Sequence, residues 1–258
     1  MGTTGTPMET PGTAPTTIVA EKPQLSQPQR IINTFIDPVK TFTDLRRGTA
    51  WWMAFIFIAI CSYVFVAAVA TKIGFEQVNE NQMRMNPKQM ERIDQMPPAD
   101  RARAMDMGAK ITKYISYGFP VVALIVFAIT AAILMAIFNF GFGAQVSFGQ
   151  SLAVVVYASL TGSLKSLLTA IALFAGANPE NFTFENPIAS NLGFFVDMNA
   201  HPVLYRFASS MDVFMIWYVV LLGLGYACIS KVKRGTAIGV VAGLWLGWVL
   251  IATAIKAI

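Results

Sequence analysis

A lysine stands inside an otherwise apolar stretch of the sequence, and its position is the first to indicate chemistry. Lys165 lies in the run 151–175, fourteen residues after its start and ten before its end. An ionisable side chain at that depth in a membrane is costly, and such residues usually pair with another group or line a pathway. Thr161 and Thr169 stand four residues before and after it, on one helix face, and Ser166 is adjacent. We treat these four residues as an intramembrane polar site.

Two interpretations of this polar site stay open. In the functional one, it lines a cavity or conduction path in which Lys165 contacts an anion or acts as a proton-linked switch. In the structural one, the ammonium pairs with backbone carbonyls or with an acid, and the hydroxyls bond across helices. The candidate acids are Asp212, Asp197 and Glu185. The apolar runs contain no interior Asp or Glu. This favours the structural interpretation, because a single cation without an intramembrane acid offers too few groups for a pump mechanism.

The residues available for hydrolytic chemistry are fewer still. The single histidine, His201, precedes a proline where a helix start is expected. Zinc protease motifs need two histidines a turn apart, an intramembrane aspartyl site needs two buried acids, and a serine hydrolase needs a Gly-x-Ser-x-Gly elbow. The sequence contains none of these patterns. We therefore expect no enzyme activity, no metal site and no cofactor.

The elements that must position these residues follow from composition. Of 258 residues, 55% are hydrophobic and 13% charged, whereas soluble domains carry roughly 25% charged residues. A bilayer core needs about 20 apolar residues per span, and lipid offers no water to unpaired backbone groups, so each apolar run should be helical. Five runs qualify: 51–73, 111–138, 151–175, 213–229 and 237–258. The sequence predicts an all-α polytopic membrane protein, a bundle of five transmembrane helices with short interfacial helices.

The chain divides into three regions. Residues 1–28 are rich in Thr, Pro and Gly and predict a disordered tail. Residues 29–48 predict amphipathic helices lying in the membrane interface, with Asp37-Pro38 as an N-cap and first-turn proline. A helix packed under the bundle is the alternative for this segment. Residues 49–258 form the transmembrane domain, which contains a polar helical insertion at 74–110 and a second polar loop at 176–212.

Prolines mark the expected helix starts within the two polar segments. In the insertion, Asn86-Pro87 and Pro97-Pro98 predict two helices, whose mixed charges are typical of a solvated face. In the second loop, Asn186-Pro187 predicts a short amphipathic helix over 188–196, and His201-Pro202 predicts another helix.

Aromatic and basic residues near the span ends predict the interfaces and the orientation. The positive-inside rule places the basic residues before the first span and those between the last two spans in the cytoplasm, with the N-terminus. The basic residues of the insertion oppose this orientation. We name the basic and aromatic residues at the ends of the first, fourth and fifth spans the interfacial anchors: Arg46, Arg47, Trp51, Trp52, Lys231, Lys233 and Arg234. The net charge of +5 comes from scattered residues rather than a basic face, so no nucleic-acid partner is expected.

A glycine repeat marks the last span as a packing surface. Glycine recurs at every fourth position, which leaves one helix face flat enough for a second backbone to approach. The residues are Gly235, Gly239, Gly243 and Gly247. We expect this stripe to pack inside the chain against the preceding span, through Gly223, rather than to mediate dimerisation.

Three stretches together resemble the YIP domain family, which is named for Ypt/Rab-interacting membrane proteins. They are "FIDPVKTFTDL" before the Trp-rich first span, "ASNLGFFVD" in the second polar loop and "WYVVLLGLGYACISKVKRGTA" across the fourth span. The resemblance covers about residues 30–258 and is strongest to the bacterial-type branch. It implies five transmembrane helices, a cytoplasmic N-terminus and self-association or partner binding. An Asp-Leu-Tyr-Gly-Pro motif tied to Rab binding is replaced here by "RRGTAWW".

Two functions follow as expectations. The first is a non-enzymatic membrane organiser that lies in the lipid bilayer and binds protein partners, or itself, through the N-terminal tail and polar loops. The second is a small transporter or channel component with a polar path past Lys165. The expected location is the bacterial inner membrane, or Golgi and endoplasmic reticulum membranes in a eukaryote.

Overall fold

The computed structural model describes residue 2 and residues 24–197 and 200–257. The tail predicted for residues 1–28 lies almost wholly outside the described residues, and its last two residues already belong to a helix. Helix α1 (Gln27–Ile36) begins there because Ser26 and Gln29 form a capping box.

A second short helix, α2 (Pro38–Asp44), follows directly. The Asp37 side chain accepts a hydrogen bond from the Lys40 amide, which confirms the predicted cap. Phe42 and Leu45 are completely buried, and α2 packs against the transmembrane helix α10 (Val213–Ile229). Of the two interpretations given for residues 29–48, the helix packed under the bundle therefore describes α2.

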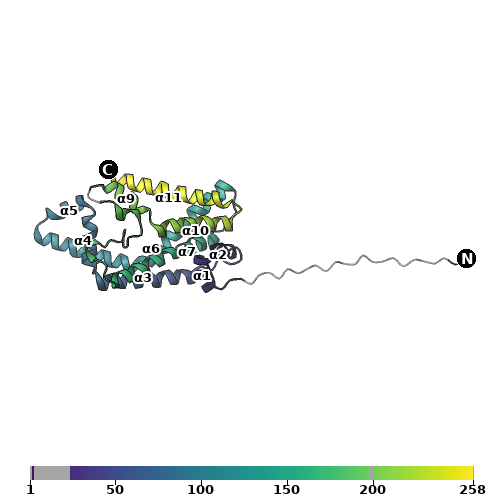
Figure 1. Cartoon of the computed structure of the whole chain (residues 1–258), viewed down its shortest axis with the longest axis horizontal. Helices are drawn as coiled ribbons and strands as arrows, with labels where there is room; N and C mark the ends of the chain where they lie inside the picture. The colour runs from purple at the N-terminus through teal and green to yellow at the C-terminus, as the bar shows by residue number, and fades with distance from the viewer. Residues whose placement is uncertain (1, 3–23, 198–199, 258) are drawn as a thin grey trace.

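Five apolar segments form a single bundle (Figure 1). Besides α10 they are α3 (Trp52–Lys72), α6 (Pro98–Phe142), α7 (Phe148–Ala158) continued by α8 (Leu160–Phe174), and α11 (Arg234–Ala257). Four of the five are long and apolar enough to cross a membrane, and α10, with 17 residues, is shorter. The described residues form no strand beyond one isolated bridge, between Asn191 and Asp212. The chain is an all-α, multi-pass membrane protein.

The third span is interrupted, which its apolar run did not predict. Helix α7 starts at a capping box of Ser147 and Gln150, is wholly buried from Ser151 onward, and ends at Ser159. The Ser159 hydroxyl donates to the carbonyl of Val155 at 2.8 Å, a local bond that competes with helix geometry. Helix α8 then continues the span with the polar site in its first three turns.

The short helix α10 leaves part of the bundle without a transmembrane helix. It runs antiparallel to α11 (Figure 1), and a side chain at Gly223 would meet the Ile238 backbone at 2.5 Å, so the two helices touch there. Val213, the first residue of α10, stands ten residues before Gly223, and Trp248 stands ten residues after Ile238. Because the helices are antiparallel, α10 begins level with Trp248. Beyond that level, the loop 176–212 and helix α9 (Pro202–Ser210) occupy the bundle.

The glycine stripe faces outward, so the expectation that it packs inside the chain is wrong. A side chain added at Gly235, Gly239, Gly243 or Gly247 would meet nothing within 4 Å. The buried side of α11 instead carries Ala237, Val241 and Val249, which are at most 6% exposed. Each of them stands two positions after a glycine of the stripe, which corresponds to about 200° of helix rotation. They therefore lie on the face of α11 opposite the stripe. Gly223 does pack as predicted, but against Ile238.

The two ends of the bundle differ in content (Figure 1). One end carries α1, α2 and the turn between α10 and α11. The other carries α4 (Phe75–Arg84), α5 (Pro87–Asp94), the start of α6, the second polar loop and the C-terminus. Helix α6 has 45 residues, about 67 Å at 1.5 Å per residue, so it extends well beyond a hydrocarbon core of about 30 Å.

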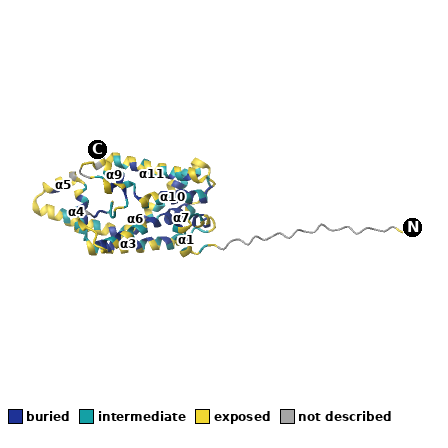
Figure 2. Cartoon of the chain, in the orientation of Figure 1, coloured by how far each residue is buried: buried dark blue, intermediate teal, exposed yellow. Residues whose placement is uncertain are grey.

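Exposure follows the pattern expected for lipid contact (Figure 2). Large apolar side chains on the outer faces of the spans are open, including Val121 and Ile129 of α6, at 67% and 54%, and Ile251 of α11, at 56%. The core of small and aromatic residues lies around α7, where Val154, Val155 and Tyr157 are completely buried.

The polar segments follow their proline signals only in part. Helices α5, α6 and α9 begin at Pro87, Pro98 and Pro202, as predicted. The helix predicted for 188–196 is wrong: that segment contains bends and a 3-10 turn, Leu192–Phe195, because Asn191 pairs with Asp212. Helix α4 was not anticipated. Its Asn81 amide donates to the carbonyls of Pro179 and Phe182, at 2.8 and 2.9 Å, and thereby joins the two polar segments.

Candidate functional site

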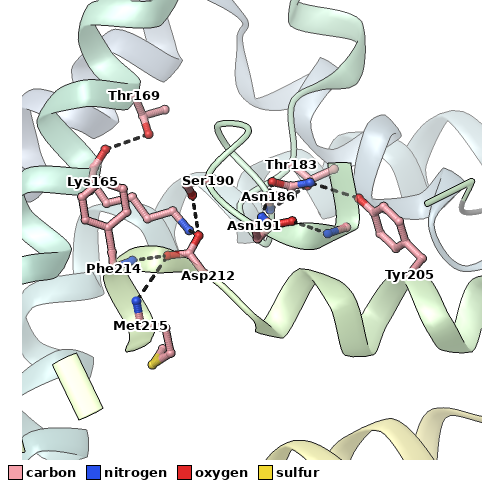
Figure 3. Close-up of polar contacts among 11 residues, drawn as sticks. Lys165, Thr169, Thr183, Asn186, Ser190, Asn191, Tyr205, Asp212, Phe214 and Met215 are labelled. Atoms are coloured by element: carbon pink, nitrogen blue, oxygen red, sulfur yellow. Dashed lines mark hydrogen bonds and ion pairs between the residues drawn. The ribbon is translucent and has the colours of Figure 1, made fainter. Parts of the chain in front are cut away.

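Lys165 forms an ion pair with Asp212 (Figure 3). The lysine Nζ lies 2.9 Å from Oδ2 of the aspartate, and the two side chains are 22% and 7% exposed. Asp212 is the residue immediately before α10. The aspartate therefore reaches the lysine because α10 starts inside the bundle rather than at its end. Asp212, one of the three acids named as candidate partners, is thus the one that pairs with Lys165.

Asp212 has further partners that hold it in place (Figure 3). Its Oδ1 accepts from the amides of Phe214 and Met215, at 2.9 and 3.3 Å, as an N-cap, and its Oδ2 also accepts from the Ser190 hydroxyl. Burial acts to raise the pKa of this carboxyl, but the hydrogen bonds from Ser190 and Lys165 and the lysine charge outweigh it. The net effect lowers the pKa of Asp212 below its ordinary value, so the aspartate is a carboxylate at neutral pH.

Amide side chains hold the loop beside this pair (Figure 3). The Asn191 amide donates to the side-chain carbonyl of Asn186 at 2.7 Å, and the Asn186 amide donates to the Tyr205 hydroxyl at 3.3 Å. The Val213 amide donates to the carbonyl of Ser190 at 3.0 Å. These bonds connect the loop, α9 and the start of α10 into one polar layer.

A cavity of about 700 Å³ adjoins the ion pair. Its walls come from α3, α6, α8, α9, α10, α11 and the second polar loop. The volume lies within the range of ligand pockets, roughly 300–1,000 Å³. The short α10 explains why space remains here, because the loop and α9 do not refill the bundle completely.

The predicted polar site is only partly brought together. Thr161, Lys165 and Ser166 line the cavity, whereas Thr169 does not. Thr169 is buried, and its hydroxyl donates to the Lys165 carbonyl at 2.9 Å; that of Thr161 donates to the Ala158 carbonyl at 3.2 Å. Both threonines thus bond within the third span, Thr169 inside α8 and Thr161 to the last residue of α7, and not to other spans. The sequence reasoning missed Arg206, which also lines the cavity, because a single arginine in a polar loop carries no pattern.

A second buried ion pair lies at the opposite end of the bundle, and it too was missed. Arg30, in the segment 29–48 that was expected to form amphipathic helices, is 1% exposed. Its Nε lies 2.8 Å from Oδ2 of Asp44, and its Nη1 donates to the carbonyl of Ala50 at 3.4 Å. The Tyr157 hydroxyl donates to the same carbonyl at 3.1 Å. This pair joins α1 and α2 to the bundle.

Comparison with known proteins places the chain in a family. The sequence model of the Yip1 domain matches residues 32–256. The chain belongs to the Yip1 domain family. Searches of curated proteins and of solved structures give no match.

The cavity of this Yip1 domain is lined by charged, hydroxyl and apolar side chains. Among the described residues, no group of three or more His, Cys, Asp or Glu side chains could hold a metal ion. His201 does not line the cavity that contains Lys165. The cavity offers cations, hydroxyls and an apolar wall, a combination that can hold an amphipathic molecule.

Proposed function

We propose that this protein is a non-enzymatic membrane organiser of the Yip1 type, which binds protein partners through its N-terminal tail and polar loops. One observation carries this proposal. Helix α5 and the first turns of α6 stand clear of the bundle (Figure 1) and present charged residues of both signs to solvent. A surface of this kind, on the largest polar element, suits recognition of another protein.

The projecting part has a defined shape. Arg101 of α6 pairs with Asp94 of α5 at 3.0 Å, which fixes the two helices to one another, and Ile93 is 5% exposed beneath them. The side chain of Arg103 is 83% exposed and has only a long contact, 3.9 Å, with Asp100. An exposed cation on a rigid support is available for a partner, because a surface pair of that length contributes little to stability.

The orientation and location belong to the same proposal. The segment from α2 into α3 and the turn from α10 into α11 lie at the same end of the bundle (Figure 1). By the helix bounds, these two segments contain the anchors Arg46, Arg47, Trp51, Trp52, Lys231, Lys233 and Arg234. That distribution supports a cytoplasmic N-terminus in a bacterial inner membrane. The outward glycine stripe leaves a flat surface for self-association.

Site-specific photo-crosslinking in the native membrane tests the organiser proposal. A crosslinking amino acid at position 103 should give a defined protein adduct, which Arg101→Glu should abolish by separating α5 from α6. The same amino acid at position 129, on the apolar face of the same helix, is the matched control and should give no such adduct. Identical adducts at both positions, or none at position 103, would contradict partner binding through the insertion.

A second function has one observation in its favour. The cavity beside Lys165 could be part of a path for a small transporter or channel component. Liposomes containing the purified protein should then move an ion or solute, and Lys165→Met should abolish that flux. A Lys165→Met variant that folds and complements a deletion strain would exclude the transport function and leave the organiser.

A further inference from the structure

The cavity beside Lys165 has one polar side and one apolar side. The polar side comes from α9, the loop and α8, and includes Arg206, Ser209, Asn186 and Ser163. The apolar side comes from α6 and α11 and includes Phe119, Val126, Phe127, Trp245, Trp248 and Val249. A water-soluble ion would use only the first side, whereas a molecule with a charged head and a hydrocarbon chain would use both.

The polar side contains groups without partners. Arg206 is half-buried, and its guanidinium makes no ion pair or hydrogen bond within residues 24–197 and 200–257. The hydroxyl of Ser209 is buried and likewise lacks a hydrogen-bond partner in that part of the chain. Buried polar groups are normally satisfied, so these groups favour a ligand that accepts hydrogen bonds from a hydroxyl and a guanidinium.

The partners of the charged lining residues indicate the sign of that ligand, because their formal charges cancel. Two cations, Lys165 and Arg206, and two acids, Glu185 and Asp212, face the cavity, and Glu185 has a partner of its own. Asp212 is already bonded to Lys165, Ser190 and two backbone amides. Arg206 is therefore the cation available to an anion, and guanidinium binds phosphate and carboxylate groups through paired hydrogen bonds.

The position of the two sides fits a lipid in the bilayer. Helix α9 contacts α11 at Thr253, five residues beyond Trp248 toward the end of the bundle, whereas Trp245 lies deeper. The polar side with Arg206 is thus nearer the membrane surface, and the apolar side extends toward the bilayer centre. Phe119, Val126 and Trp248 of this apolar side are 48–69% exposed, and they belong to α6 and α11, whose outer faces carry open apolar side chains such as Val121 and Ile251.

We propose that this cavity binds an anionic lipid, with the phosphate held by Arg206 and the neighbouring Ser209 hydroxyl and one acyl chain lying between α6 and α11. This inference goes beyond partner recruitment and does not depend on the projecting part of the insertion. The bound lipid fills space that the short α10 leaves open. The Lys165–Asp212 pair forms the floor of the head-group site.

Native mass spectrometry of the detergent-purified full chain tests this assignment. The probes are phosphatidylglycerol, phosphatidylcholine and inorganic phosphate, added separately. Phosphatidylglycerol should bind about tenfold more tightly than phosphatidylcholine, and Arg206→Gln should remove about a tenfold preference. Arg103→Gln, the same change on the projecting part, is the control and should leave the preference intact.

A second variant tests the cavity itself without depending on charge. Gly162 lines the cavity, and a side chain there would meet nothing within 4 Å, so Gly162→Leu should fold and fill the space. It should reduce phosphatidylglycerol binding about tenfold or more. Unchanged binding in both Gly162→Leu and Arg206→Gln would overturn the site. Competition by millimolar inorganic phosphate, with no preference between the two lipids, would overturn a lipid ligand in favour of a soluble anion.

Discussion

The two buried ion pairs of this bundle have nearly the same length but very different surroundings. Arg30 and Asp44 meet at 2.8 Å and Lys165 and Asp212 at 2.9 Å. The arginine pair lies among completely buried side chains such as Phe42 and Tyr157, whereas the lysine pair adjoins a cavity and leaves 22% of the lysine exposed.

This difference separates a structural pair from a pair that can meet a ligand. In a dry, buried ion pair, removing one partner leaves the other charge buried and alone, and the desolvation of that charge is costly. The two residues therefore stabilise the fold only together. The lysine of the second pair is 22% exposed, and Asp212 has further partners, so loss of the lysine is less costly. The first end of the bundle thus holds the fold together, and the second provides a site.

Removal of the two cations gives the largest predicted contrast. Arg30→Met should lower the free energy of unfolding by about 3–5 kcal/mol, because Asp44 stays buried without its partner. Lys165→Met should lower it by about 1–2 kcal/mol, because Asp212 keeps Ser190 and two amides. Unfolding in mixed detergent micelles measures both, with the exposed Arg46→Met as control. Equal losses for the two variants would refute the contrast.

Two glycines test packing at the same two ends. A side chain at Gly225 would lie 2.4 Å from Val154 and 3.2 Å from Phe42, both completely buried. Gly225→Ala should therefore destabilise the protein by about 1–3 kcal/mol. Gly162→Ala, beside the cavity, should be neutral or stabilise by up to about 1 kcal/mol, since alanine favours the helix. Thermal unfolding of the two variants compares them, and destabilisation by Gly162→Ala would show that the cavity end is packed.

The smallest predicted effect concerns pH. Because the folded-state pKa of Asp212 is lowered, its contribution to stability should be complete above the unfolded value of about 3.9. That contribution should disappear as the pH falls through the lower folded-state value. Stability of the wild type and of Asp212→Asn, measured from pH 7 to pH 2, should therefore converge only below about pH 4. Convergence already at pH 6 would contradict a lowered pKa of Asp212.

The spans could be predicted from the sequence because lipid imposes one rule on every apolar run. The run 213–229 coincides with α10, and the first span, 51–73, differs from α3 by one residue at each end. Helix α4 was missed, since it has few apolar residues and no proline at its start. The break at Ser159 was missed because a serine inside an apolar run is also compatible with a continuous helix.

Of the candidate site, only the charged residues of the ion pair could be predicted from the sequence. Lys165 was identifiable by depth, and Asp212 by being one of few nearby acids. The cavity was not, because it depends on where α10 starts relative to α11. Arg30 was misplaced because its partner, fourteen residues away on another helix, cannot be inferred from helical spacing. The glycine stripe correctly predicted a flat helix face, but the expected partner of that face, the preceding span, was wrong. The pattern does not say which face of the helix turns inward.

Helix α6 has a mechanical consequence. It is one continuous helix from Pro98 to Phe142, and Phe119, Val126 and Phe127 on it form part of the cavity wall. Such a helix behaves as a stiff lever: a sideways load on its projecting tip changes the tilt of the membrane segment as well. The weakest point of the lever is Pro120, where the helix lacks one backbone hydrogen bond. Force applied outside the membrane is therefore converted into bending beside Phe119, at the wall of the cavity.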